Sequence, residues 1–152
     1  MEILRSVLRE LPEFQQLLAA LDGGQSPVAV SGLAAVHRAH FAACLGQESG
    51  RPVVMVCADE GEAERMARDL SFLTGGEVPV LAARSFLFHN IATVSRQWEH
   101  RRLRLLYRLT RGEIPCLVAT VEALLQRTLP PEALERACAV LEVGQTADLE
   151  EL

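Results

Sequence analysis

The stretch of sequence that decides the fold is PVVMVCADEGEAERMARDLSFLTGGEVPVLAA, residues 52–83. An uninterrupted apolar run opens it, apolar residues at spacings of three and four follow, and a pair of glycines precedes a second apolar run. Asp59 stands where a helix needs its N-cap, because a carboxylate there accepts a backbone N–H of the first turn. We therefore expect a strand at 52–57, a helix that Asp59 caps, and a strand at 77–83.

The same alternation of strands and helices continues on both sides of this stretch. Before it, two short helices end at a glycine pair, and a strand at 26–31 leads into a helix at 33–45. After it, we expect an irregular connection at 84–95, a helix at 98–109, a strand at 114–120, helices at 121–129 and 132–137, and a strand at 138–143. Apolar strands separated by amphipathic helices are typical of a parallel sheet covered on both faces. We predict the α/β class with a doubly wound parallel sheet.

The composition is that of one globular domain. The chain has 152 residues, of which 49% are apolar and 23% charged, and a mean hydropathy of +0.16. A chain of this length and apolar content buries one core and is not disordered. We expect a single domain over residues 1–143, with a helical lead at 1–24. The polar stretch 144–152 has little with which to pack and is expected to open a following module.

Cysteine usage and the lack of long apolar runs indicate the compartment. The four cysteines stand far apart, without a CxxC pair, at Cys44, Cys57, Cys116 and Cys138. This pattern favours reduced thiols in a cytoplasmic protein. The amino end mixes charged residues into its apolar positions, and no apolar run approaches the roughly 18 residues of a membrane span. We therefore expect a cytoplasmic protein without a membrane partner.

The basic residues narrow the possible chemistry. All fifteen are arginine, and against twenty acidic residues they leave a formal net charge of −5. This balance argues against a surface devoted to polyanions. Because the chain has no lysine, Schiff-base chemistry and the phosphate-contacting lysine of a Walker A loop are excluded.

The turn after the expected strand at 26–31 is the place to test for a nucleotide site, because ligands of doubly wound sheets bind at the carboxyl ends of strands. A phosphate loop of the form GxxxxGK[ST] provides glycines, a lysine for the phosphate charge and a hydroxyl for magnesium. The turn here reads Ser31, Gly32, Leu33, Ala34, Ala35, Val36, His37 and Arg38. Val36, His37 and Arg38 stand where glycine, lysine and Ser or Thr are required. We interpret the turn as a vestigial loop and expect no cofactor and no triphosphate hydrolysis.

Two further groups of polar residues are given structural roles. His37 and His40 lie three residues apart on one helix face, a spacing that metal sites use, but no further ligand stands nearby in the sequence. We expect a partly exposed helix surface there and no metal. A run of acids in the first turn of a helix complements the helix dipole and consists of Asp59, Glu60, Glu62 and Glu64. No catalytic residue is identified.

Residues 84–111 stand out by their charge, with seven arginines against the single acid Glu99. On the expected helix the arginines recur at three and four residues along one face. The resulting candidate interaction patch consists of Arg96, Arg101, Arg104, Arg108 and Arg111. Such a stripe either contacts phosphates or an acidic protein surface, or it pairs with carboxylates of neighbouring helices, the interpretation that we favour. Trp98, at the start of the helix, is expected to anchor the core.

The order of these segments resembles a known family. The segments are VAVSGLAAVHRAHFAACL, RPVVMVCADEGEAERMARDLSFL, RQWEHRRLRLLYRLTRGEIPCLVATVEALLQRTLPP and LEVGQ. Together they look like the amino-terminal region of the bacterial transcription-repair coupling factor (Mfd), over about residues 10–145. No single motif carries the resemblance, which rests on the joint order of the segments.

The resemblance implies a fold and a set of partners. In that family the region is similar to the first domain of the excision-repair protein UvrB, a RecA-like helicase fold, and its nucleotide loop has decayed, as Gly32 to Arg38 would have here. The damage-probing hairpin of UvrB would fall between Phe88 and Trp98, where too few residues stand for it. The family's motor lies in other domains. The implied partners are those domains, and UvrA and RNA polymerase through the full-length protein.

Three functions follow as hypotheses. The preferred one is a non-catalytic scaffold domain of a coupling factor that displaces stalled RNA polymerase and recruits UvrA for nucleotide excision repair. The second is a helicase half in which Arg38 replaces the lysine, a role that its planar guanidinium fills poorly. The third is a nucleic-acid-binding module that uses the arginine stripe, with weak binding to DNA.

Overall fold

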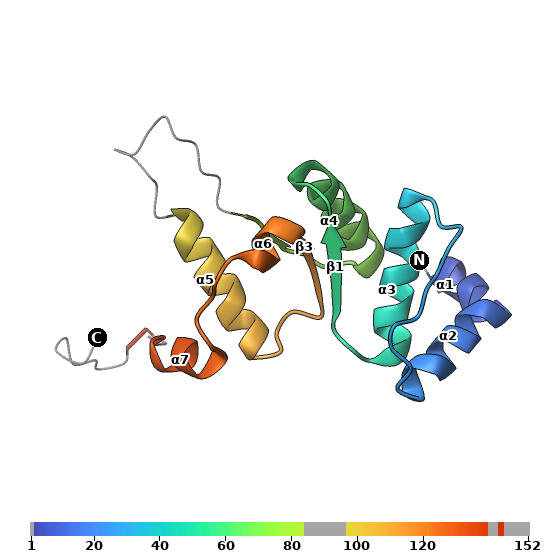
Figure 1. Ribbon diagram of the computed structural model, residues 1–152, viewed down its shortest axis with the longest axis horizontal. Helices are drawn as coiled ribbons and strands as arrows, with labels where there is room; N and C mark the ends of the chain where they lie inside the picture. Colours follow the sequence, from blue (N-terminus) through green and yellow to red (C-terminus); the bar gives the residue numbers. More distant parts are fainter. Residues whose placement is uncertain (1, 84–96, 140–142, 145–152) are drawn as a thin grey trace.

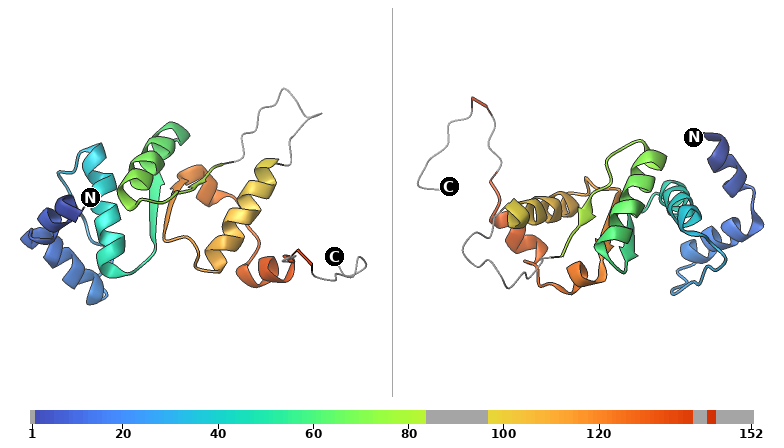
Figure 2. Two further views of the ribbon diagram at one scale, coloured as in Figure 1. Left: turned by 180° about the vertical axis from the view of Figure 1, so that it is seen from behind. Right: turned by 90° about the horizontal axis from the view of Figure 1, so that it is seen from above.

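The computed structural model describes residues 2–83, 97–139 and 143–144, with residues 2–5 described by their backbone alone. In chain order the elements are α1 (Glu2–Arg9), α2 (Pro12–Asp22), α3 (Ala35–Ser49), β1 (Val53–Cys57), α4 (Glu60–Thr74), β2 (Val80–Leu81), α5 (Gln97–Thr110), β3 (Cys116–Thr120), α6 (Val121–Leu125) and α7 (Pro131–Arg136). A small sheet stands between α3 and α4 on one side and α5 on the other, and α1 and α2 lie outside α3 (Figures 1 and 2). Among the described residues, no helix combines the length and the apolar character needed to cross a membrane.

The sheet has three parallel strands in the order β1-β3-β2. The central strand β3 is buried along its whole length and pairs with β1 so that Val53 stands opposite Cys116. Parallel neighbours require crossover connections, and helices supply them here. The structure thereby confirms the α/β class, a parallel sheet, and strands within 52–57, 77–83 and 114–120.

The first face of the sheet carries the larger core cluster. Alternate residues of β1 and β3 point to this face, which α3 and α4 cover. The buried members are Ala39, Ala42, Ala43, Cys57, Ala63, Met66, Ala67, Leu70, Val78, Cys116 and Val118. The alanines of α3 and α4 leave room for the two helices to pack closely on the strands.

The second face of the sheet is covered only in part. Leu117 and Ala119 of β3 pack with Leu81 of β2 beneath α5. On the same face β1 places Val54 opposite Leu117 and Val56 opposite Ala119, and these two valines remain 50% and 52% exposed. Strands of parallel sheets are ordinarily covered on both faces, so this part of β1 is an exposed apolar surface.

The strand expected at 26–31 is not formed. These residues connect α2 to α3 without pairing to the sheet, and Val28 and Val30 remain 39% and 48% exposed. The reason lies in α2, which packs on the outer side of α3, where the buried ring of Phe14 meets that of Phe41 edge-on at 5.2 Å. The connection therefore runs along the outside of α3 and away from β1 (Figure 1). The prediction of a strand here is wrong.

The carboxyl-terminal elements are also shorter than predicted. α6 ends at Leu125, where a helix is expected through residue 129, and Gln126 has extended backbone. Leu124 and Leu125 are 50% and 79% exposed, so continuing the helix would bury little, and helices depend on such packing. The described part of 138–143, residues 138–139 and 143, forms no strand. The connection expected at 84–95 and the module expected at 144–152 lie outside the described residues, apart from residue 144.

α3 extends to Ser49, beyond the end expected at residue 45. Gly46 lies where α3 packs on β1, and a Cβ atom there would stand 2.8 Å from Cγ2 of Val53. This glycine therefore permits close packing and does not end the helix. Gly50, with a φ of 64°, takes the left-handed position at which α3 ends.

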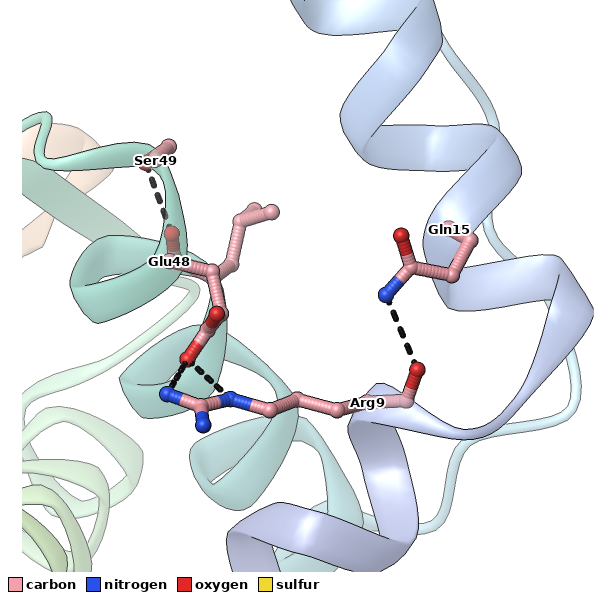
Figure 3. A network of polar contacts seen from close by, with 5 residues as sticks. Arg9, Gln15, Glu48 and Ser49 are labelled. Atoms are coloured by element: carbon pink, nitrogen blue, oxygen red, sulfur yellow. Dashed lines mark hydrogen bonds and ion pairs between the residues drawn. The ribbon is translucent and has the colours of Figure 1, made fainter.

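Polar contacts fasten α1 and α2 to the carboxyl-terminal half of α3 (Figure 3). The Arg9 guanidinium donates to the carboxylate of Glu48, and the Arg9 carbonyl accepts from the side-chain amide of Gln15 at 2.9 Å. The Ser49 hydroxyl donates to the carbonyl of Leu45 at 2.6 Å. α1 and α2 both lie within the stretch 1–24, where a helical lead is expected.

Candidate functional site

The turn predicted to be a vestigial nucleotide loop is exposed and follows no strand. Gly32 has a φ of 82°, a conformation that glycine adopts without strain. α3 begins three residues later, with Ala34 at its N-cap, and no side chain caps it. The turn therefore presents a helix N-terminus, but no strand end carries it to the carboxyl edge of the sheet.

Arg38, which would replace the lysine of a phosphate loop, is engaged by a carboxylate. Its Nη1 atom lies 3.6 Å from Oε1 of Glu62 on α4. Glu62 also accepts the backbone N–H of Ala58 at 3.1 Å, while Asp59 accepts that of Glu62 at 2.8 Å. Asp59 is the N-cap of α4, as expected, and with Glu62 it forms a variant of the capping box in which Glu62 accepts the N–H of Ala58 instead of that of Asp59. A triphosphate at this turn would meet two carboxylates beside one guanidinium.

The same charges act on Cys57, the last residue of β1. Burial raises the pKa of the Cys57 thiol, Glu62 raises it further, Arg38 lowers it and Asp59 adds a smaller increase. Burial also raises the pKa of the Cys116 thiol. All four cysteines are free in the structure. Burial thus favours the protonated and less nucleophilic form of the Cys57 and Cys116 thiols.

The two histidines of α3 lie near the same turn. His37 is exposed, whereas His40 is half-buried, and its Nε2 atom is buried without a hydrogen-bond partner. Within the described ranges, no three side chains of His, Cys, Asp or Glu gather in a way that could hold a metal ion. The pair therefore remains without an assigned ligand.

The arginine stripe of α5 divides into two parts. Of its predicted members the structure describes Arg101, Arg104, Arg108 and Arg111, whereas Arg96 lies outside the described residues. Arg101 and Arg104 are exposed and form no ion pair with any described residue. The Nε atoms of Arg108 and Arg111 lie 3.5 and 3.2 Å from carboxylate oxygens of Glu113. Because Glu113 stands in the turn directly after α5, this partner is local and not on a neighbouring helix.

Sequence reasoning overlooked Arg102, which lies on the buried face of α5. Only 9% of the residue is exposed, and its guanidinium donates to the carbonyls of Ala82 at 3.3 Å and Ala123 at 2.9 Å. Burial lowers the pKa of Arg102. The guanidinium stands 5.8 Å from the ring centre of Trp98, which is half-buried and covers Arg102 instead of anchoring the core. The available signal was spacing, since Arg102 follows Trp98 by four residues and precedes Leu105 by three.

A cavity of about 720 Å³ lies near the amino ends of the strands. Its walls include Gly46 of α3, Val53 of β1 and Cys116 of β3. Arg38, which belongs to the predicted nucleotide turn, and Glu62 lie instead beside Cys57 at the carboxyl end of β1. This cavity therefore does not coincide with the predicted nucleotide turn.

Curated proteins from two bacteria are similar to this chain over nearly its whole length. No protein-family model matches it, and no solved structure matches it. The transcription-repair-coupling factor of Bacillus subtilis (strain 168) is 27% identical over 154 residues, which cover 100% of this chain and 13% of that protein. That of Myxococcus xanthus is 33% identical over 147 residues, which cover 91% of this chain and 12% of that protein. The chain is therefore a relative of the bacterial transcription-repair coupling factors and spans about an eighth of their length.

Proposed function

We propose that this chain is a non-catalytic module of a transcription-repair coupling factor and that it acts by docking onto other domains of that protein. The observation that carries the proposal is the uncovered face of β1, where Val54 and Val56 are 50% and 52% exposed. Parallel strands are stable when both faces are buried, and exposed apolar surface of this kind marks interaction sites. Docking of another domain on this face would complete the cover of the sheet.

The surroundings of Arg38 support a module without nucleotide chemistry. The guanidinium that would contact phosphates lies 3.6 Å from Glu62, and Asp59 lies beside Glu62 in the capping box. The parallel sheet flanked by helices is compatible with a RecA-like domain, and the turn at 31–38 would then be its decayed nucleotide loop. Charge repulsion from the two carboxylates opposes a triphosphate there.

The relation to coupling factors supports a role in transcription-coupled repair. In a protein that displaces stalled RNA polymerase and recruits UvrA, the module would organise the UvrA-recruiting part and restrain the motor through interdomain contacts. RNA polymerase and UvrA would then be partners of the full-length protein, of which this chain corresponds to about an eighth.

Isothermal titration with ATP and magnesium tests the non-catalytic part. We expect no heat of binding up to millimolar nucleotide, because Arg38 is neutralised by Glu62 and the turn has neither lysine nor hydroxyl at the required positions. A micromolar dissociation constant that Arg38→Ala abolishes would overturn this part of the proposal.

Binding in trans tests the docking part. We would mix the chain with the Myxococcus xanthus coupling factor from which the matching region has been removed and measure the complex by sedimentation. Val56→Asp should weaken the complex by about tenfold or more, because a carboxylate would be buried in the contact. Val36→Asp is the matched control, since Val36 is 59% exposed but lies on α3. Equal effects of the two substitutions, with both variants folded, would contradict docking at β1.

The exposed arginines favour a second function, binding of nucleic acid. Arg101 and Arg104 are exposed and pair with no carboxylate of the described residues, whereas Glu113 neutralises part of the charge of Arg108 and Arg111. Arg101→Glu combined with Arg104→Glu should therefore reduce affinity for duplex DNA more than the same change at Arg108 and Arg111. Fluorescence anisotropy at low salt measures this difference. Absence of binding at low salt would remove this function.

A further inference from the structure

A pocket of about 400 Å³ lies between α5 and the connection from α6 to α7. α5 contributes Trp98, Arg102 and Leu106 to its wall, and the connection contributes Arg127 and Leu129. Its volume lies within the range of about 300–1,000 Å³ that is usual for small-ligand sites. Like those sites, it combines apolar walls with a few polar groups that converge on one space.

The polar centre of this pocket is a buried cation, Arg102. Arg102 is 9% exposed and donates to the carbonyls of Ala82 and Ala123. A guanidinium has further N–H donors in the same plane. Within the described parts of the chain no carboxylate forms an ion pair with Arg102. A charge buried with carbonyl partners alone keeps much of its desolvation cost, which an anionic ligand would offset.

The walls define what else the ligand must carry. The Trp98 ring, Leu106 and Leu129 offer apolar contact, and an indole ring stacks well on flat aromatic groups. Arg127 is exposed beside the pocket and adds a second positive charge. We propose that this pocket binds a carboxylate carried on an apolar, aromatic body, with the carboxylate on Arg102 and the ring against Trp98. This site goes beyond the docking function and does not depend on it.

The charges favour a carboxylate over a phosphate. Glu99 also lines the pocket, so a doubly charged phosphate would meet a carboxylate as well as the guanidinium. A carboxylate carries one negative charge and matches the planar fork of a guanidinium through two parallel hydrogen bonds. The apolar walls provide little solvation for a second negative charge.

Trp98 makes the proposal measurable, because it is the single tryptophan of the sequence. Its fluorescence would be followed during titration with 3-phenylpropionate and, in parallel, with the uncharged 3-phenylpropionamide. The acid should bind about tenfold more tightly than the amide, since a charge-assisted hydrogen bond replaces a neutral one. Equal affinities for acid and amide, or no change in Trp98 fluorescence up to millimolar acid, would overturn the proposal.

Variants on the exposed rim test the site without disturbing the buried hydrogen bonds of Arg102. Arg127→Ala and Leu129→Glu should each weaken binding of the acid several-fold, the first by removing a positive charge and the second by adding a negative one. Arg101→Ala is the control, because it removes an exposed charge from the stripe of α5. Circular dichroism confirms that each variant is folded. Loss of binding in the control to the same extent as in Arg127→Ala would contradict the site.

The carboxylate could come from a free small molecule or from the end of a peptide chain. A short peptide ending in phenylalanine, with a free or an amidated terminus, distinguishes the two sources. Tighter binding of the free-acid peptide than of 3-phenylpropionate assigns the site to a protein terminus, and the reverse order assigns it to a small molecule. Binding of the amidated peptide as tightly as the free-acid peptide would count against the carboxylate.

Discussion

Arg38 on α3 and Arg102 on α5 lie on opposite sides of the sheet and use one residue type in two ways. Arg38 is the arginine of the predicted nucleotide turn, next to the position where such a loop needs its lysine, yet it is partly exposed and lies 3.6 Å from Glu62. Arg102 belongs to no known motif, yet it is buried and held by two main-chain carbonyls. A carboxylate pairs with the first charge, whereas no carboxylate of the described residues pairs with the second. Electrostatic surroundings, more than the place in a motif, decide which cation a ligand can use.

The two arginines also differ in what they hold together. Arg38 joins α3 to α4 through one ion pair between partly exposed side chains, and such pairs contribute little. Arg102 joins α5 to the end of β2 through Ala82 and to α6 through Ala123. Its loss would leave both carbonyls without their side-chain donor and remove packing against Trp98. Arg102 is therefore expected to stabilise the second face of the sheet, where α5 provides the cover.

The largest predicted effect contrasts these two arginines directly. Arg102→Ala should lower the free energy of unfolding by about 2–4 kcal/mol, because it removes one buried and one partly buried hydrogen bond and the stem of a buried side chain. Arg38→Ala should lower it by about 1 kcal/mol or less, as is usual for an exposed ion pair. Urea unfolding followed by circular dichroism measures both values. Equal losses would show that burial of the guanidinium does not distinguish the two sites.

A smaller effect is expected at the helix caps of the two regions. Asp59 caps α4 beside Arg38, and the hydroxyl of the buried Thr120 accepts the N–H of Ala123 at 3.1 Å and caps α6 beside Arg102. Asp59→Ala and Thr120→Val should each cost about 1 kcal/mol, the usual value of an N-cap.

Of these two substitutions, only Thr120→Val should affect the pocket beside α5. Ala123 both donates to Thr120 and accepts from Arg102, so Thr120→Val should alter Trp98 fluorescence in the folded state. Asp59→Ala should leave that fluorescence unchanged, because α4 lies on the other face. A fluorescence change in Asp59→Ala alone would contradict the separation of the two regions.

Local patterns made the unit at 52–83 predictable. Its strands are continuous apolar runs, and its helix has apolar residues at spacings of three and four residues. Asp59 marks the start of that helix and Gly75 marks its end. The run at 26–31 has the same apolar, β-branched character but does not pair. Whether such a run joins a sheet depends on how the elements around it pack. Here Phe14 packs α2 on the outer side of α3, so the connection runs away from β1. That packing connects residues distant in sequence and leaves no local pattern.

The features of the candidate site that depend on residue type could be predicted from the sequence. Those that depend on contacts between residues distant in sequence could not. The missing lysine and hydroxyl of the turn can be read from the sequence alone. The pairing of Arg38 with Glu62 cannot, because the two residues stand on different helices. The buried role of Arg102 could not be predicted, because residues 84–111 contain six other arginines and together they suggest a charged surface. Its helical phase, shared with Trp98 and Leu105, is what sets it apart.

A dependence on pH is also expected, and Arg38 influences it through Cys57. The pKa values of the Cys57 and Cys116 thiols are raised above 9.0 in the folded chain, whereas the unfolded chain loses these protons near that value. The free energy of unfolding should therefore be constant below about pH 9 and fall as the pH rises further, by up to about 1.4 kcal/mol per pH unit for each thiol. Urea unfolding between neutral and alkaline pH measures this slope, which Cys57→Ala should reduce.

Two arginine variants then separate the regions through Cys57. Arg38 lowers the pKa of Cys57, so Arg38→Ala should raise it further and slow alkylation of this thiol in the folded chain at alkaline pH. Arg127→Ala, beside the pocket of α5, should leave the alkylation rate unchanged, because Arg127 does not act on Cys57. Mass spectrometry of the alkylated peptides distinguishes Cys57 from the less buried Cys138. Faster alkylation in Arg38→Ala would mean that Arg38 does not stabilise the thiolate and that the charges at the end of β1 are arranged differently.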